Sequence, residues 1–327
     1  MEMLVSWRDI ELARETIKGC GVVVRTPLLR NVEQIFGFED RFKLHLKMEN
    51  MQNTGSFKIR GVVNQFANIP SVITENKKSL VSMSAGNYGK AFALATKEQN
   101  LPATLCMPET APINRAKLIE SFGVKVERIP TSEIQYAIDL HVAEDGMHFL
   151  HPFDDLHLIS GFASVALEIL EDIPEPDVVV VCCGGGGFLS GVAAGIKLKG
   201  KKKTRIFGVE PEGAPTMYLS KQQGHAVSVK SVNTIAAGLA PPYAGKKTFQ
   251  HVKEYVEDIV LVTDEEIKRA VKTFYQAGLV VEPSGAAAFA ALQANKIPDL
   301  SEGSNVVAIV TGGNVTPEEL CDLMNCN

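Results

Sequence analysis

The sequence predicts an α/β protein of two domains, each built around an open and mostly parallel sheet. Apolar stretches of strand length alternate with stretches of helix length along the 327 residues, which is the pattern of parallel strands joined by helices. Residues 177–183 form a nearly continuous apolar run, as expected for a parallel strand buried on both faces. Four glycines follow this run directly, so the predicted strand leads through a glycine-rich turn into a helix.

The elements of the first half are predicted from capping patterns and alternation. Residues 6–9 resemble a capping box and mark the start of a first helix. Residues 43–48 alternate polar and apolar side chains, which indicates a strand that runs into the segment containing Lys58. Between this strand and a stop at Gly123 we expect further strands at 80–83 and 103–107 and helices at 88–99 and 113–122.

The second half continues the same alternation. Thr263 and Thr316 are each followed by acidic residues that suit the first turn of a helix, and Pro317 suits the first helical position. We expect strands at 177–183, 258–262 and 306–310, and a helix at 188–199.

No linker rich in proline, glycine or serine marks the boundary between the two predicted domains. We therefore place it from the predicted elements: residues 80–155 form a small domain, and residues 1–79 and 156–327 form a large one. The active site is expected in the cleft between them.

Composition argues against several classes of function. The net charge is −5, so we expect no nucleic-acid partner. No apolar stretch approaches the ~20 residues of a membrane span, and residues 1–8 lack the pattern of a signal peptide. The six cysteines show no metal or disulfide spacing. Cys182 and Cys183 are interpreted as small core residues, which fits a reducing, cytoplasmic location.

The segment at residues 54–61 carries the strongest functional signal. It places Lys58 after a glycine-containing turn, at the predicted start of a helix. A lysine that forms a Schiff base must be neutral to attack an aldehyde, and both a helix N-terminus and burial disfavour the ammonium form. The motif Ser-Phe-Lys alone would still suit an exposed surface lysine, so the interpretation depends on the loops that follow.

Three loops accompany this lysine along the chain. Residues 84–89 join a predicted strand to a helix, and Thr311 follows a predicted buried strand. Four adjacent glycines allow successive backbone N–H groups to converge on a phosphate at a helix N-terminus, although a tight turn alone is the alternative. These glycines are Gly184, Gly185, Gly186 and Gly187. They do not form the Gly-x-Gly-x-x-Gly pattern of dinucleotide sites.

In this order, the lysine segment and the three loops resemble the fold-type II enzymes that depend on pyridoxal 5′-phosphate, specifically the serine/threonine dehydratase (ammonia-lyase) and serine racemase family. The resemblance spans roughly residues 26–315 and implies the tryptophan synthase β-like fold. It implies that Lys58 holds the cofactor as a Schiff base and acts as the catalytic base. It also implies that Phe57 lies against the cofactor ring, that Asn87 contacts the 3′-oxygen, that the four glycines bind the phosphate and that Thr311 faces the pyridine nitrogen.

The resemblance assigns the loop at residues 84–89 to the substrate carboxylate. Its expected substrate-binding residues are Ser84, Ala85, Gly86, Asn87 and Tyr88. An ordinary connection between a strand and a helix stays open as an alternative, because such turns are common. Glu282 lies in another family motif and is expected to line the site.

A divalent cation, Mg²⁺ or Ca²⁺, binds in part of this family. The resemblance places its ligands at Glu210 and the carbonyl of Ala214, but Thr216 stands where a third, carboxylate ligand is expected. Hard cations prefer carboxylate oxygens, so a solvated acidic loop without metal stays equally open. The segment at residues 151–155 contains a histidine and two aspartates, and we interpret it as a structural hinge.

The expected reaction is the elimination of water from L-threonine or L-serine, followed by release of a 2-oxo acid and ammonia. A hydroxyl such as that of Thr311 cannot keep the pyridine nitrogen protonated, and the resulting weaker electron sink suits β-elimination. Racemisation needs a second acid on the face opposite the lysine. The racemases of the family have a serine there and an arginine elsewhere, whereas this chain has Ala85 and Gln135.

Alternatives stay open beside this dehydratase. Serine or aspartate racemase is the first, β-replacement the second, and a scaffold protein that only keeps the fold the third. Tyr88 and Phe162 suggest an altered pocket that could favour a bulkier β-hydroxy amino acid. The resemblance implies a homodimer with a small amino-acid substrate, and we expect a short form without a regulatory domain.

Overall fold

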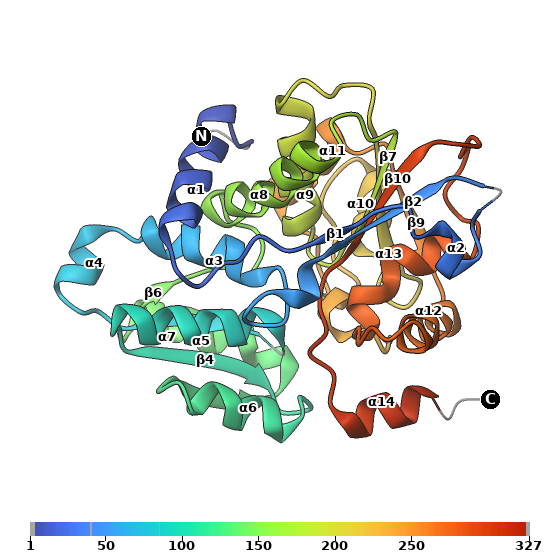
Figure 1. Cartoon of the computed structure of the whole chain (residues 1–327). Coiled ribbons are helices and arrows are strands. Elements are labelled where there is room, and N and C mark those ends of the chain that lie inside the picture. Colours follow the sequence, from blue (N-terminus) through green and yellow to red (C-terminus); the bar gives the residue numbers. More distant parts are fainter. Residues whose placement is uncertain (1–3, 40, 85, 325–327) are drawn as a thin grey trace.

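The computed structural model describes residues 4–39, 41–84 and 86–324. These residues form two open sheets flanked by helices (Figure 1). In spatial order, the larger sheet contains β1 (Leu28–Leu29), β2 (Lys43–Met48), β10 (Asn305–Val310), β7 (Val178–Cys182), β8 (Arg205–Pro211) and β9 (Asp258–Val262). The smaller sheet contains β5 (Lys125–Ile129), β4 (Ala103–Pro108), β3 (Leu80–Met83) and β6 (His148–Phe149). All described strand pairs except β1 with β2 are parallel, so the predicted α/β class is confirmed.

Helices connect these strands and cover the sheets. They are α1 (Trp7–Gly19), α2 (Glu33–Phe36), α3 (Lys58–Ala67), α4 (Ser71–Glu75), α5 (Asn87–Gln99), α6 (Ile113–Glu120), α7 (Ile134–Ala143), α8 (Leu156–Asp172), α9 (Gly187–Leu198), α10 (Thr216–Gln223), α11 (Lys246–Tyr255), α12 (Asp264–Gln276), α13 (Pro283–Gln293) and α14 (Pro317–Met324). The predicted capping box at Ser6 is confirmed, and Thr263 forms a second one. No helix in the described ranges is long and apolar enough to cross a membrane.

The strands of the smaller sheet all fall between Leu80 and Phe149, and those of the larger sheet lie outside that stretch. The division into a small domain at 80–155 and a large domain at 1–79 and 156–327 stays a prediction.

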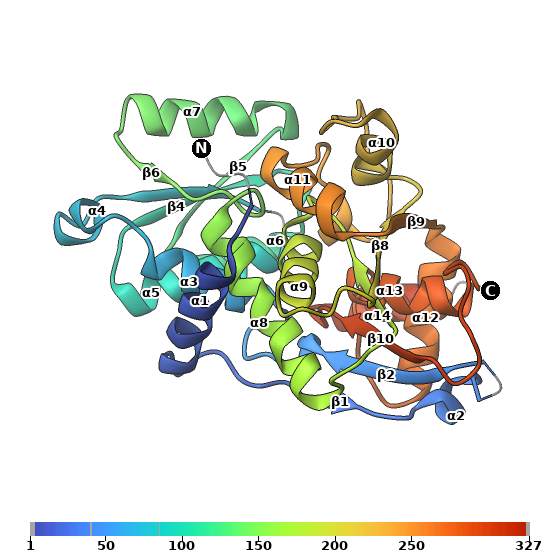
Figure 2. The ribbon, with the colours of Figure 1, turned by 90° about the horizontal axis from the view of Figure 1, so that it is seen from above.

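Helix α8 packs closely between α3 and α9, and this packing fixes the position of Lys58 at the start of α3 (Figure 2). Glycines allow the close approach. A Cβ atom added at Gly61 of α3 would lie 2.4 Å from the ring of Phe162, and one added at Gly191 of α9 would lie 2.4 Å from the carbonyl oxygen of Ile159. Side chains larger than hydrogen at these positions would push the helices apart.

A buried ionic network also holds α3 in place. The guanidinium group of Arg60, which is fully buried, donates to both carboxylate oxygens of Glu49 at 2.8 and 2.9 Å. It also donates to both oxygens of Glu168 on α8, at 2.7 and 2.8 Å. Lys47 of β2 donates to Glu168 as well. The network therefore joins the larger sheet, α3 and α8 two residues away from Lys58.

Candidate active site

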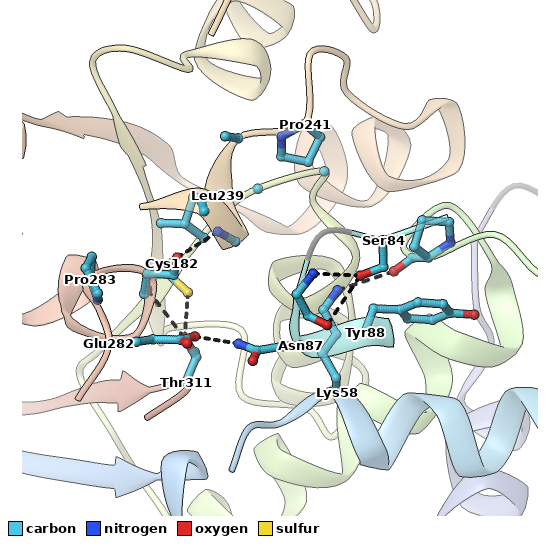
Figure 3. Close-up of a pocket in the computed structure, with 18 of the residues that line it drawn as sticks. Lys58, Ser84, Asn87, Tyr88, Cys182, Leu239, Pro241, Glu282, Pro283 and Thr311 are labelled. Carbon is cyan, nitrogen blue, oxygen red and sulfur yellow. Dashed lines mark hydrogen bonds between the residues drawn. The ribbon is translucent and has the colours of Figure 1, made fainter. Parts of the chain in front are cut away.

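A cavity of about 610 Å³ opens where several loops of the two sheets meet (Figure 3). Its walls come from the start of α3, from the loop between β3 and α5, and from the loops that follow β7 and β10. The carboxyl ends of parallel strands are the usual place for ligands in open α/β sheets. The cavity brings together most of the residues singled out in the sequence, namely Phe57, Lys58, Ser84, Gly86, Asn87, Tyr88, Gly184, Gly185, Gly186, Gly187, Glu282 and Thr311.

Lys58 is the first residue of α3 and reaches the cavity half-buried. Its Nζ donates to the carbonyl oxygen of Pro152 at 3.3 Å and lies 5.1 Å from the ring centre of Phe57. No carboxylate of the described residues forms an ion pair with it. Burial therefore lowers the pKa of Lys58 to about 8. Near neutral pH an appreciable fraction of this amine is uncharged and can act as a nucleophile or a base.

The four glycines form the turn between β7 and α9, and they leave no room for side chains. Gly186 is the N-cap of α9 with φ of +92°, and an added Cβ would lie 2.5 Å from Met217 Cε. An added Cβ at Gly185 would lie 2.3 Å from the ring of Phe153. Among the described residues, no side chain caps the first N–H groups of α9, which therefore offer donors and a positive helix end to an anion. This cradle fits the phosphate of the expected cofactor.

The variant Gly186→Ala is expected to weaken pyridoxal phosphate binding at least about tenfold. Gly200→Ala is a matched control, because Gly200 also has φ of +92° but an added Cβ there would meet no heavy atom of the described residues within 4 Å. Both variants carry the left-handed backbone strain of about 1–2 kcal/mol, and only the first must also displace Met217. Titration with pyridoxal phosphate, followed by absorbance, measures the cofactor affinity, and thermal unfolding measures the backbone strain. Equal cofactor affinities in both variants would contradict the assignment of this turn to the phosphate.

A chain of amide and carboxyl groups lines the opposite wall. Asn87 Nδ2 donates to Glu282 Oε1, and Asn87 Oδ1 accepts from Asn314 Nδ2 at 2.7 Å. Asn314 Oδ1 accepts in turn from Lys90 Nζ at 2.9 Å. Burial raises the pKa of Glu282 to about 7, although the hydrogen bond from Asn87 opposes the shift. The orientation of the Asn87 amide is therefore fixed from both sides.

Thr311 supplies a buried hydroxyl at the end of β10. Its Oγ1 lies 3.1 Å from Cys182 Sγ and 3.5 Å from the carbonyl oxygen of Ser284. Burial raises the pKa of Cys182 to about 12, so this thiol stays neutral. Both Cys182 and Cys183 are buried, as predicted, and both also line the cavity. The hydroxyl of Thr311 can donate a hydrogen bond here without adding charge.

The loop between β3 and α5 is shaped by Ser84. Its Oγ accepts from the N–H groups of Gly86 and Gly89 at 3.1 and 3.0 Å. The ring of Tyr88 lines the cavity, but its hydroxyl points away and donates to Gln65 Oε1 at 2.9 Å (Figure 3). Burial raises the pKa of Tyr88. Ala85, the other predicted member of this loop, lies outside the described residues.

The predicted cation ligands lie elsewhere. Glu210 and Ala214 are fully buried and neither lines the cavity. The carboxylate of Glu210 accepts from the N–H groups of Met217 and Tyr218, at 2.9 and 2.8 Å, and thus caps the start of α10. Burial raises the pKa of Glu210 to about 8. The alternative of a solvated acidic loop is wrong for Glu210, because β8 carries it into the core.

Pro152 and Phe153 of the segment at residues 151–155 line the cavity, and the interpretation of this segment as a hinge stays a prediction. His151 Nδ1 accepts from the N–H groups of Phe153 and Asp154, at 3.2 and 2.9 Å. Burial lowers the pKa of His151 to about 4, so the ring is neutral. It shapes the loop that carries Phe153 against the glycine turn.

Sequence reasoning missed several residues of the cavity wall. Arg115 of α6 forms an ion pair with Glu319 of α14 at 3.0 Å, which links the two sides of the cavity. Tyr243 lines the cavity beside Phe153, with ring centres 5.3 Å apart. A single arginine or tyrosine outside a motif carries no signal of its own. Asn314, by contrast, belongs to the glycine-containing segment after β10, so its place beside Asn87 could have been predicted.

Comparisons with known proteins agree with this geometry. The family described as "Pyridoxal-phosphate dependent enzyme" matches residues 21–312. L-threonine ammonia-lyase of Thermotoga maritima is 37% identical over 329 residues, which cover 98% of this chain and 79% of that protein. Among solved structures, the processed form of threonine deaminase isoform 2 from Solanum lycopersicum is 30% identical, with a TM-score of 0.86 over 98% of this chain and 89% of that one. Maize serine racemase is 32% identical, with a TM-score of 0.85 over 98% of this chain and 97% of that one. The chain therefore belongs to the pyridoxal-phosphate dependent enzyme family and has the fold-type II architecture.

Proposed function

We propose that this chain is an ammonia-lyase that removes water from L-threonine and L-serine and releases a 2-oxo acid and ammonia. The observation that carries the proposal is the position of Lys58, a lysine with a lowered pKa that faces a glycine cradle and the neutral hydroxyl of Thr311. The similarity to a protein named L-threonine ammonia-lyase supports the choice of substrate.

The residues of the cavity fit pyridoxal phosphate, which when bound supplies an electrophilic aldehyde and an electron-accepting ring. Lys58 would hold it through Nζ, with Phe57 beside the ring. The N–H groups at the start of α9 would bind its phosphate, and Thr311 Oγ1 would donate to the ring nitrogen. Asn87 would hold the 3′-oxygen, since Glu282 and Asn314 already fix its amide.

Lys58 Nζ, once its amine is free and neutral, would accept the Cα proton of the substrate. The backbone of the loop at residues 84–89 would bind the substrate carboxylate, with Ser84 holding that loop in shape. Tyr88 would contribute its ring as a wall beside the substrate rather than its hydroxyl as a ligand.

Racemisation is the second candidate, because the chain is also similar to maize serine racemase. That reaction needs a proton donor opposite Lys58. Tyr88 suits this role poorly, since its hydroxyl donates to Gln65 and burial raises its pKa. Ala85, which has no acidic side-chain proton, stands where the resemblance places the donor. These observations favour elimination.

Three further expectations from the sequence stay predictions within this proposal. They are the cytoplasmic location, the homodimer and the cation at Glu210 and Ala214. A cation there would have to compete with the N–H groups of α10 for the carboxylate oxygens of Glu210.

The proposal is tested by incubating the cofactor-loaded protein with L-threonine and, separately, with L-serine. Equal amounts of 2-oxo acid and ammonia are expected from each, measured by a coupled dehydrogenase assay and an ammonia assay. Accumulation of D-serine without a 2-oxo acid would instead support the racemase.

A further inference from the structure

Three side chains with metal-ligating atoms meet on the smaller sheet, away from the cavity. They are Cys106 on β4, Glu127 on β5 and His141 on α7. The thiol sulfur, a carboxylate oxygen and an imidazole nitrogen all lie within 4.8 Å of one another. None of the three residues lines the cavity, so the proposed catalytic function does not account for the cluster.

The backbone brings these residues together for simple reasons. Cys106 and Glu127 are partners in the parallel register of β4 and β5, so their side chains lie on the same face of the sheet. Helix α7 runs along this face, where Ile134 and Ile138 pack with Cys106 (Figure 2). His141, one turn further along α7, then reaches the edge of the same face.

Neighbouring groups hold the imidazole and the carboxylate in fixed orientations. His141 Nε2 lies 2.9 Å from Glu127 Oε2, and His141 Nδ1 lies 2.7 Å from Asp145 Oδ2. The other oxygen of Glu127 accepts from Lys125 Nζ at 2.7 Å. A carboxylate on the far nitrogen of a histidine is the usual partner of a metal-binding imidazole, because it fixes the ring and raises its basicity. Here Asp145 has that position.

We propose that Cys106, Glu127 and His141 bind one divalent transition-metal ion, preferably Zn²⁺, through sulfur, carboxylate oxygen and Nε2. One sulfur, one nitrogen and one oxygen ligand suit tetrahedral Zn²⁺, with a water molecule in the fourth position. Binding releases the thiol proton of Cys106 and any proton on His141 Nε2 to solvent. His141 and Glu127 are only partly buried, which gives the ion a route from solvent.

The alternative is an ion-pair cluster without metal. Burial opposes the charge of His141, but Glu127 and Asp145 outweigh it and raise the pKa of this histidine. An imidazolium between two carboxylates explains those two contacts. It does not involve the Cys106 sulfur, which lies within 4.8 Å of both groups. A bound cation would stabilise the thiolate beside the carboxylate.

The test uses Co²⁺ as a spectroscopic substitute for Zn²⁺ in the chelator-treated protein loaded with pyridoxal phosphate. One equivalent is expected to bind and to give the visible ligand-field bands of a tetrahedral site, at wavelengths where the cofactor does not absorb. Zn²⁺ should displace it. Cys106→Ser should lose the tetrahedral bands, and Cys321→Ser, which changes an exposed cysteine, should keep them.

A second variant covers the case in which the Cys106 variant fails to fold. Asp145→Asn alters an exposed side chain and should weaken Co²⁺ binding about 10- to 100-fold while the bands keep their shape. Two results would overturn the proposal. One is the lack of stoichiometric Co²⁺ uptake by the unmodified chain. The other is uptake with the same affinity and spectrum in the Cys106 and Asp145 variants, which would place the ion elsewhere.

Discussion

The variant Lys58→Ala is expected to lower the turnover of L-threonine at least about 10⁴-fold, because it removes both the attachment point of the cofactor and the base. The protein should stay folded. Lys58 has no carboxylate partner among the described residues, and burial disfavours its charge, so its removal leaves no buried counter-charge behind. Stability should change by less than about 1 kcal/mol.

The position of the attachment is measured by borohydride reduction of the cofactor-loaded protein followed by peptide mass analysis. The added pyridoxyl mass should lie on Lys58 and be lost in the variant. Lys78→Ala is a suitable control, since Lys78 is an exposed lysine that does not line the cavity. Retention of turnover by the Lys58 variant would contradict the proposed role of this residue.

The variant Arg60→Met is expected to destabilise the protein by about 3–5 kcal/mol, because it leaves Glu49 as a buried carboxylate without its main partner. Glu49 is fully buried and accepts two hydrogen bonds from Arg60. The same guanidinium holds Glu168 of α8. Methionine preserves most of the buried volume, so the loss reports on charge rather than on a cavity. Urea unfolding followed by circular dichroism measures the change.

The loss of stability caused by Arg60→Met should depend on pH. Burial opposes the charge of Glu49, but Arg60 outweighs it and lowers the pKa of this carboxyl. In the unmodified chain its contribution to stability is therefore present above the unfolded pKa of about 4.3 and is lost as pH falls through the lower folded value. Without Arg60, burial raises the folded pKa, so the carboxyl favours folding only when protonated. The difference between the two proteins should be smaller at about pH 4.5 than at about pH 7.

Arg14→Met is the matched control for this effect. Arg14 forms an ion pair with Glu171 at the surface, and such pairs contribute about 0–1 kcal/mol. Two results would contradict the proposed role of the buried ionic network. One is a loss of stability in the Arg60 variant that is no larger than in the control, and the other is a loss that does not change with pH.

Local signals were sufficient for the parts of the fold that carry the cavity. The helix start at Lys58, the strand at 43–48 and the glycine turn before α9 follow from alternation, burial pattern and turn chemistry. The helix start at Lys58 and the strand at 43–48 lie where they are predicted, and α9 begins at Gly187, one residue before its predicted start. The glycines of this turn are visible in the sequence because the close contacts around them leave no room for side chains.

Other parts depend on contacts between distant residues and gave no local signal. Strand β5 is only partly buried and contains charged residues, so it lacks the apolar run that marks β7. The ion pair of Arg115 with Glu319 joins α6 and α14, which only the folded chain brings together. The same holds for Glu210, whose burial and helix-capping contacts depend on α10 folding back over β8.

The measurement that tests elimination most directly is proton NMR in D₂O of the cofactor-loaded protein with L-serine. Formation of a 2-oxo acid is expected, with little deuterium at Cα of the remaining serine, because Lys58 would remove the proton and elimination would follow. Deuterium accumulating at Cα with little 2-oxo acid, together with D-serine, would contradict the account. It would show that another group returns a proton opposite Lys58.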